Sequence, residues 1–193
     1  MRVKRTISFI IDFMIIMIVF FIINSIFPSN NEVRILKAKQ NEIIEKYTMH
    51  EIDFRSYVKE YSIVIYNLDK EQMVVNIIYL VFMLGYTLLL PLLWKGRTVG
   101  SYVCNIQVER FDKGYLYVHQ LLIRNVLVFG LGYLIAKNIL IFIVPSKYYF
   151  ITISSIGIIQ IVLALFSACM ILFTKNKRGL QDLISNTEMA RIM

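Results

Sequence analysis

Four apolar segments of 20 to 24 residues constrain this chain more than any other feature of its sequence. They cover residues 6–27, 73–94, 125–144 and 150–173. About 20 helical residues cross the roughly 30 Å of hydrocarbon in a bilayer, because each residue adds about 1.5 Å. The segments must be helical, since lipid offers no water to bond a free amide or carbonyl. The sequence therefore predicts an all-α membrane protein with a bundle of four transmembrane helices in a lipid bilayer.

The first and third of these segments need separate consideration. The first follows Arg2, Lys4 and Arg5 and imitates a secretory signal, but its 22 residues are too many and no A-x-A cleavage site follows. We therefore expect it to stay attached as the first membrane helix. The third is interrupted by Lys137 and Asn138. If it does not cross, the C-terminus lies on the other side of the membrane.

The composition excludes several other classes of protein. Of the 193 residues, 58% are hydrophobic and 18% charged, whereas a soluble domain has about half and about a quarter. Two Cys residues are too few for a secreted disulfide scaffold. No Ser-His-Asp, His-Glu-x-x-His or P-loop pattern occurs, and the Cys and His residues lack metal-ligand spacing. We therefore expect no enzyme activity, no metal and no cofactor.

Basic residues are distributed unevenly around the apolar segments. Residues 1–5, 95–124 and 174–193 hold three, five and four of them, 12 in all, against four acidic residues, whereas 28–72 holds seven basic and eight acidic ones. Because Lys and Arg are retained on the cytoplasmic side, we expect a multi-pass protein of the plasma membrane with both termini in the cytoplasm. The spread over three segments, rather than one groove-sized patch, argues against nucleic acid as a partner. Attraction to anionic lipid headgroups would coexist with this topology.

The apolar segments divide the chain into six parts, two of which have structure of their own outside the membrane. The parts are the N-terminus with the first span (1–27), an outer segment (28–72), the second span (73–94), a cytoplasmic segment (95–124), the third and fourth spans (125–173) and a cytoplasmic amphipathic tail (174–193).

The outer segment, 28–72, is predicted to form two amphipathic helices. One apolar stripe at helical spacing comprises Phe54, Tyr57, Val58, Tyr61, Val64, Ile65 and Leu68, and a weaker one comprises Leu36, Ile43 and Tyr47. We expect an extracytoplasmic helical insertion. Either it lies on the lipid surface or against the helix ends, or it provides a docking face for another protein.

The cytoplasmic segment contains a pattern typical of strands. Polar and apolar residues alternate over 103–109, residues 111–114 end in Gly114 and supply a turn, and 115–118 provide a returning strand. The sequence therefore predicts a short cytoplasmic β-hairpin, which is too small to be an independent enzyme domain.

Asp12 is an ionisable residue inside the first apolar segment, about 9 Å from its start at 1.5 Å per residue. A charged Asp costs on the order of 2.5–3.5 kcal/mol near the centre of a membrane helix, so we expect it to face a partner or a water-filled cavity. Arg5, Ser8 and Asp12 share one helix face, but their side chains lean in ways that disfavour a direct bridge between Arg5 and Asp12. We therefore expect Asp12 to accept from Arg124, and Arg5 to meet a carboxylate from a cytoplasmic segment.

Lys137 lies about 18 Å into the third segment, some 9 Å deeper than Asp12 at 1.5 Å per residue. It reaches Asp12 only if the helices tilt. Its side chain can instead extend past Val144 to the outer headgroups, which is the interpretation we favour.

Several short motifs flank the apolar segments. They are Lys4-Arg5-x-x-Ser8-x-x-Ile11-Asp12, then Gly96-Arg97-Thr98-Val99-Gly100, Val108 with Asp112-x-Gly114, Arg124, and Arg178-Gly179-Leu180-Gln181-Asp182-Leu183-Ile184-x-x-Thr187. In their order and spacing they resemble the motifs of the RDD family, small bacterial membrane proteins named for one Arg and two Asp. By this resemblance Arg5, Asp12 and Asp182 are the three residues that give the family its name. Residues 28–72 lie outside the resemblance and look like an insertion.

The resemblance also implies a role. Some members of the family are proposed to exchange cations for protons, and most have no assigned role. This chain departs from the family pattern at Ser8, at Asn186 and at Gln181, where the family often has His. Without that His, no side chain next to Asp182 titrates near neutral pH, which weakens a proton-relay interpretation.

Asp182 follows the fourth span in a segment where Leu180, Leu183, Ile184 and Thr187 form a helical stripe. We expect a short helix at the cytoplasmic membrane surface. In the structural interpretation, Asp182 pairs with Arg5 and fastens the tail to the first helix. In the functional one, Asp12 and Asp182 mark the two ends of a cation path, for which four helices leave little room unless the protein dimerises.

Two hypotheses for the function follow. One is a non-catalytic accessory protein of regulatory, resistance or immunity type, in which a partner binds the outer segment and the polar cluster of Arg5, Asp12, Arg124 and Asp182 is structural. The other is a small cation/proton exchanger that uses Asp12, with Ser8 and Lys137 as secondary candidates. We favour the accessory role, because no second buried carboxylate completes an ion site.

Overall fold

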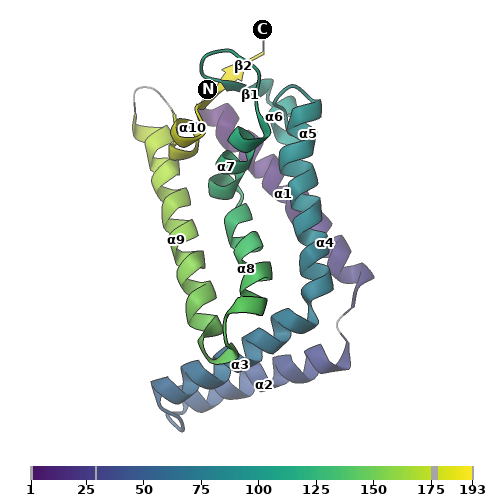
Figure 1. Cartoon of the computed structure of the whole chain (residues 1–193), viewed down its shortest axis with the longest axis vertical. Coiled ribbons are helices and arrows are strands. Elements are labelled where there is room, and N and C mark those ends of the chain that lie inside the picture. The colour runs from purple at the N-terminus through teal and green to yellow at the C-terminus, as the bar shows by residue number, and fades with distance from the viewer. Residues whose placement is uncertain (1, 29, 175–177, 193) are drawn as a thin grey trace.

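The computed structural model describes residues 2–28, 30–174 and 178–192, which form helices and one small sheet (Figure 1). The elements in chain order are α1 (Arg2–Ile26), α2 (Asn31–Thr48), α3 (Phe54–Glu71), α4 (Met73–Leu84), the π-helix η1 (Gly85–Leu89), α5 (Leu90–Leu93), α6 (Val99–Val103), β1 (Ile106–Arg110), α7 (Val118–Val128), α8 (Leu131–Ile143), α9 (Ser146–Phe173), α10 (Leu180–Ile184) and β2 (Thr187–Arg191).

The chain runs back and forth between the two ends of an elongated molecule (Figure 1). We call one end the terminal end; it holds both termini, α6, β1, α10 and β2. The other end holds α2 and α3, which we call the outer hairpin. This arrangement groups the segments as the charge distribution predicts. Which end faces the cytoplasm stays a prediction.

Among the described residues, three helices are long and apolar enough to cross a membrane: Arg2–Ile26, Met73–Leu93 and Ser146–Phe173. The third predicted segment, 125–144, is not one straight helix. The helix there starts earlier, at Val118, and α7 and α8 meet at an angle of 86°. The bend lies at Gly130, whose φ of +67° is a left-handed conformation that glycine adopts without steric cost. The bent pair would supply the fourth span of the predicted bundle.

Apolar side chains form the core of this bundle and also a large part of its outer surface. Ile16, Met83, Tyr86 and Leu131 form its buried core. Large apolar side chains also remain exposed along α1 and α9, including Phe13 and Phe166. A soluble monomer rarely exposes such a continuous apolar surface, which instead suits contact with lipid.

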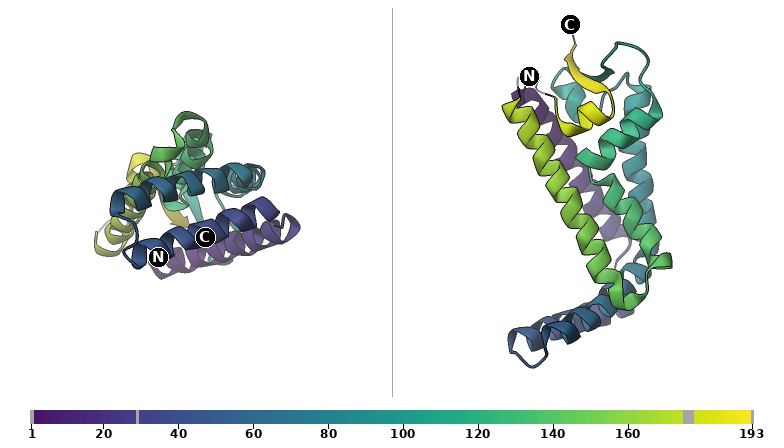
Figure 2. Two further views of the ribbon diagram at one scale, coloured as in Figure 1. Left: turned by 90° about the horizontal axis from the view of Figure 1, so that it is seen from below. Right: turned by 60° about the vertical axis from the view of Figure 1, so that its left-hand side comes forward.

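The outer hairpin confirms the two predicted amphipathic helices. Asn30 and Asp53 cap α2 and α3 through their side chains. Val33 and Ile43 of α2 bury against Val64 and Leu68 of α3. Figure 2 shows that the hairpin lies across the ends of the long helices and projects beyond them.

The outer hairpin is also fixed to the bundle by α3. The hydroxyl of the fully buried Ser62 donates to Ser146 O at 2.6 Å and accepts from Phe150 N at 2.9 Å. Tyr61 contacts the ring of Phe150 edge to face. The hairpin therefore packs on the helix ends, one of the arrangements predicted for it.

The predicted cytoplasmic β-hairpin is wrong. The first strand was predicted over 103–109, but the extended residues are 106–110, and they pair antiparallel with β2, so that Val108 lies opposite Met189. Residues 115–117 are irregular and Val118 starts α7. Tyr117 instead caps this helix, because its backbone N–H donates to the Gln120 side chain and its carbonyl accepts from Gln120 N. The C-terminal residues supply the missing edge instead.

The tail is only partly as predicted. The short helix around Asp182 is present as α10, but Thr187 belongs to β2 rather than to the helical stripe. The chain leaves the helix at Asn186, whose φ is +51°. Asn tolerates this left-handed conformation better than most residues, so a helix end is favoured there.

Candidate functional site

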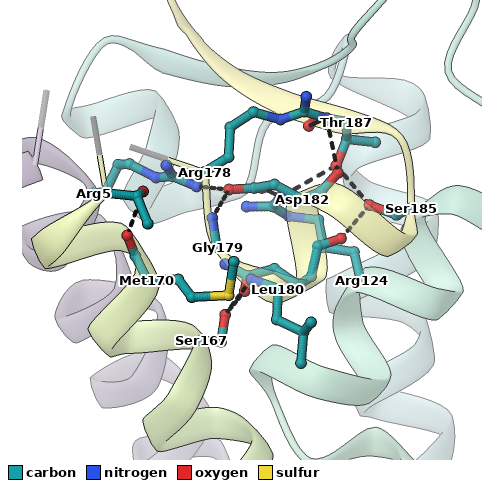
Figure 3. Close-up of polar contacts among 12 residues, drawn as sticks. Arg5, Arg124, Ser167, Met170, Arg178, Gly179, Leu180, Asp182, Ser185 and Thr187 are labelled. Atoms are coloured by element: carbon teal, nitrogen blue, oxygen red, sulfur yellow. Dashed lines mark hydrogen bonds and ion pairs between the residues drawn. The ribbon is translucent and has the colours of Figure 1, made fainter. Parts of the chain in front are cut away.

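Asp182 lies at the centre of a buried cluster of basic residues at the terminal end (Figure 3). Its side chain is fully buried. One carboxylate oxygen, Oδ2, forms an ion pair with Arg5 of α1 and accepts a 2.9 Å hydrogen bond from Gly179 N. The other, Oδ1, forms an ion pair with Arg124 of α7. Asp182 therefore joins the first helix, α7 and the tail.

Groups of the tail complete this cluster. Arg178 donates to the backbone oxygens of Asp182 and Thr187 at 3.3 and 3.2 Å, and its guanidinium lies 4.1 Å from the ring centre of Phe111. Arg124 also donates to the Thr187 hydroxyl at 3.3 Å. The cluster thereby sets the position at which β2 begins and meets β1.

The charges around Asp182 decide its protonation state. Burial by itself raises the pKa of the Asp182 carboxyl, because it disfavours the charged form. The positive charges of Arg124 and Arg5, with hydrogen bonds from Arg5 and Gly179, outweigh burial and hold this pKa below its ordinary value. Asp182 is therefore an anion at neutral pH.

Asp12 occupies a second polar site, between α1 and the segment that enters α6. Its Oδ1 accepts from Tyr86 Oη at 2.5 Å and from Gly100 N at 2.8 Å, and its Oδ2 accepts from Thr98 Oγ1 at 2.6 Å. Only 3% of Asp12 is exposed. Three donors from the protein thus satisfy a carboxylate that would otherwise be costly at this depth.

Two backbone features make this site. The π-helix η1, closed by Leu90 N bonding to Gly85 O, carries Tyr86 and Thr87, and Asn125 of α7 donates to Thr87 O at 2.5 Å. Gly100 lets α6 approach α1, because a Cβ atom there would lie 2.2 Å from Ser8 O. Single π-helical turns are frequently found at functional sites.

The comparison with protein families identifies the chain. The profile of the RDD family matches residues 2–186, nearly the whole chain. The chain belongs to the RDD family. No curated protein and no solved structure matches it. Membership and the long apolar helices together indicate a membrane protein, and the matched range also encloses residues 28–72.

The structure tests how the RDD residues are paired. Arg5 meets a carboxylate of the tail, as predicted, and that carboxylate is Asp182. The predicted contact between Arg124 and Asp12 is wrong, because Arg124 pairs with Asp182. The donors to Asp12 are Tyr86, within the second span, and Thr98 and Gly100, which follow it. The four predicted residues therefore divide into two sites, and Ser8 lies buried beside the Asp12 site.

The partners of Asp12 were missed by the sequence reasoning. Thr98 and Gly100 lie in the Gly-Arg-Thr-Val-Gly motif of the RDD resemblance, which was a usable signal. Tyr86 offered none, since an aromatic residue in an apolar span is most often part of the core. Among the described residues, no group of three His, Cys, Asp or Glu side chains is placed to hold a metal ion.

Lys137 does not reach Asp12, and its side chain points toward the outer end, which is the predicted direction. Its Nζ lies 2.8 Å from Asp69 Oδ1 of the outer hairpin, and Tyr149 Oη donates to Asp69 Oδ2 at 3.0 Å. At the outer end the Lys137 ammonium forms an ion pair with the Asp69 carboxylate. Asp69 was not a candidate in the sequence, because it follows the apolar stripe of its own helix.

Lys137→Met is expected to lower the free energy of unfolding by about 3 kcal/mol, since it leaves the Asp69 carboxylate with a neutral donor only. Lys137→Arg keeps the charge and is expected to cost less. Lys46→Met is the matched control, because Lys46 pairs with Glu42 on the exposed face of α2. Unfolding in detergent measures all three. Equal stability of Lys137→Met and Lys46→Met would contradict a structural role for the Asp69 pair.

Proposed function

We propose that this RDD-family protein is a non-catalytic accessory protein of the plasma membrane, of regulatory, resistance or immunity type, with both termini in the cytoplasm. The observation that carries the proposal is that fixed protein donors occupy the carboxylates of both Asp residues. Asp182 bonds to Arg5, Arg124 and Gly179, and Asp12 bonds to three donors. Carboxylates held by fixed donors stabilise the packing of the helices. A protein that transports ions instead needs carboxylate oxygens that can release their protein donors and bind the ion.

The outer hairpin supports a partner outside the membrane. Helix α3 packs on α4, α8 and α9, whereas α2 packs on α3 and turns its other side outward. That side carries charged residues and the apolar Ile35, which is 66% exposed. The proposed binding surface for a protein partner is therefore this outward side of α2.

A second candidate function is cation/proton exchange through Asp12. The π-helix that places Tyr86 on Asp12 favours it, as does a cavity that borders the same carboxylate. In this function Asp12 would exchange its hydrogen-bonded partners for a cation or a proton.

Flux through proteoliposomes tests the two functions against each other. The protein is reconstituted with a pH-sensitive dye inside, and Na⁺ or K⁺ is added outside. The accessory role predicts the same dye response in wild-type vesicles, in Asp12→Asn vesicles and in vesicles without protein. Asp112→Asn, which changes an exposed carboxylate, is the control for reconstitution. A cation-dependent response that Asp12→Asn abolishes and Asp112→Asn keeps would overturn the accessory role.

The same proposal predicts where a partner is found. A photoreactive amino acid at Ile35 is expected to form an adduct with one other membrane or surface protein in cells, and Lys39→Glu is expected to weaken it. The control position is Val33, which is 3% exposed and faces α3. Equal adducts at Ile35 and Val33 would remove the support for a partner on α2.

A further inference from the structure

A cavity of about 510 Å³ lies inside the terminal half of the bundle, bordered by α1, α7 and α9. Its volume is within the range of small-molecule sites, about 300–1,000 Å³. Helix α1 packs mainly on α6 and α4, and α9 packs mainly on α3 and α8. The cavity therefore lies between α1 and α9, two long helices that pack mainly on other elements and not on each other.

The cavity is bordered by basic residues at one end and mostly by apolar residues elsewhere. Arg5, Arg124 and Ser167 border it near the terminal end, which we call its polar end. Most of the remaining wall is apolar and includes Phe9, Leu127, Val128, Phe129, Ile161, Ala164, Leu165 and Ala168, to which Asp12, Thr87 and Asn125 add polar groups. Phe9 stacks on Phe129 with ring centres 5.8 Å apart, which joins α1 to the bend between α7 and α8. This polarity matches an amphiphilic molecule.

The apolar walls continue onto the outside of the molecule. Phe9 is 41% exposed, Ile161 60% and Leu165 62%. These residues belong to helices that qualify as membrane spans. The cavity is thus open to the hydrocarbon of the bilayer, and lipid is the amphiphile that surrounds it.

The charge at the polar end favours an anion. Asp182 offsets one of the two positive charges of Arg5 and Arg124, so the group of three keeps one net positive charge. A guanidinium carries five N–H donors, and the ion pair with Asp182 and the bond to Thr187 use only Nη1 of Arg124. The carboxylate of Asp12 is the other charged group on the cavity wall, so these four side chains together carry no net charge. The excess positive charge is local to the group around Asp182, because the Asp12 oxygens are bonded to Tyr86, Thr98 and Gly100 instead of to a guanidinium.

We propose that this cavity binds one anionic phospholipid. Its phosphate lies at the polar end beside Arg124 and Arg5, and an acyl chain lies along the apolar walls between α1 and α9. Arginine suits phosphate because its planar fork donates two parallel hydrogen bonds. This lipid site goes beyond the proposed accessory role, and it does not depend on whether a protein partner binds α2.

Spin-labelled lipids test the site by electron paramagnetic resonance of the reconstituted full-length protein. Wild type is expected to immobilise chain-labelled phosphatidylglycerol several-fold more than phosphatidylcholine. Ala168→Trp fills the cavity and is expected to remove that preference. Cys169→Trp adds the same ring at the same depth on the exposed side of α9, outside the cavity, and is expected to keep it. Equal immobilisation of the two lipids by wild type, or an equal effect of both Trp variants, would overturn the proposal.

A second pair of variants tests the charge without filling the cavity. Thr6 borders the cavity and is exposed. Thr6→Glu is expected to reduce the preference for phosphatidylglycerol several-fold, whereas Thr6→Gln, of the same size, is expected to retain it. Identical behaviour of the two variants would exclude recognition of an anion. Displacement of the bound lipid by millimolar glycerol phosphate would show that the site takes a water-soluble phosphate instead.

Discussion

Asp182→Asn is expected to lower the free energy of unfolding by about 3–5 kcal/mol, the range for removing one partner of a buried ion pair. The substitution keeps the size of the side chain but leaves Arg5 and Arg124 without their shared anion. Their side chains are only 8% and 9% exposed, so water does not compensate for the loss. Chemical unfolding of the purified protein in detergent measures the difference.

Asp112→Asn is the matched control for this prediction. Asp112 pairs with Arg110 at 2.7 Å, but 49% of its side chain is exposed. Exposed pairs contribute about 0–1 kcal/mol, so this variant is expected to unfold close to wild type. Similar losses in both variants would show that the cluster around Asp182 has no special structural role.

The pKa of Asp182 adds a pH dependence to the same prediction. Because this pKa is lower in the folded protein than in the unfolded chain, the ionised carboxylate stabilises the fold above the unfolded value, near 3.8. That contribution is lost as the pH falls through the lower, folded pKa. Wild type is therefore expected to lose stability below about pH 4, and Asp182→Asn is expected to lack this component.

Gly100→Ala is expected to destabilise the protein by about 3 kcal/mol or more, combining overpacking with the loss of a hydrogen bond to a charged group. The added Cβ would lie 2.2 Å from Ser8 O and 2.8 Å from Asp12 Cγ. Helix α6 would have to move away from α1, which breaks the bond from Gly100 N to Asp12. Thermal unfolding in detergent, followed by circular dichroism, measures the effect.

Gly85→Ala provides the comparison, because a Cβ there meets nothing within 4 Å and the residue has helical dihedral angles. It is expected to leave stability unchanged or to raise it by up to about 1 kcal/mol, from the lower helix propensity of glycine. If the two alanine variants unfold alike, close contact at Gly100 is not what holds α6 on α1.

The helices of this fold were largely predictable, because their signal is local. The apolar runs and the stripe through Phe54, Val64 and Leu68 identify the long helices and the outer hairpin. The bend at Gly130 was not predicted, because glycine inside an apolar span is compatible with a straight helix as well. The side of the membrane on which each end lies remains a prediction from the Lys and Arg residues.

The polar pairs were predictable only where geometry limited the choice. The lean of side chains along α1 correctly separated Arg5 from Asp12 and directed Arg5 to the tail. The same reasoning chose Asp12 as the partner of Arg124, because sequence does not reveal how far the tail folds back. The strand partner of β1 was missed for the same reason: β2 lies far along the chain, whereas the expected partner lay five residues away.

The ion pair between Arg5 and Asp182 joins residues 177 positions apart. During synthesis the first helix must enter the membrane long before Asp182 exists. The terminal end can therefore close only after Asp182 has been synthesised. A product that stops before residue 178 would keep the guanidinium groups of Arg5 and Arg124 near the membrane without this carboxylate, and it would lack the edge strand that covers β1. Closure of the terminal end is thus coupled to synthesis of the tail, which supplies both Asp182 and the strand that pairs with β1.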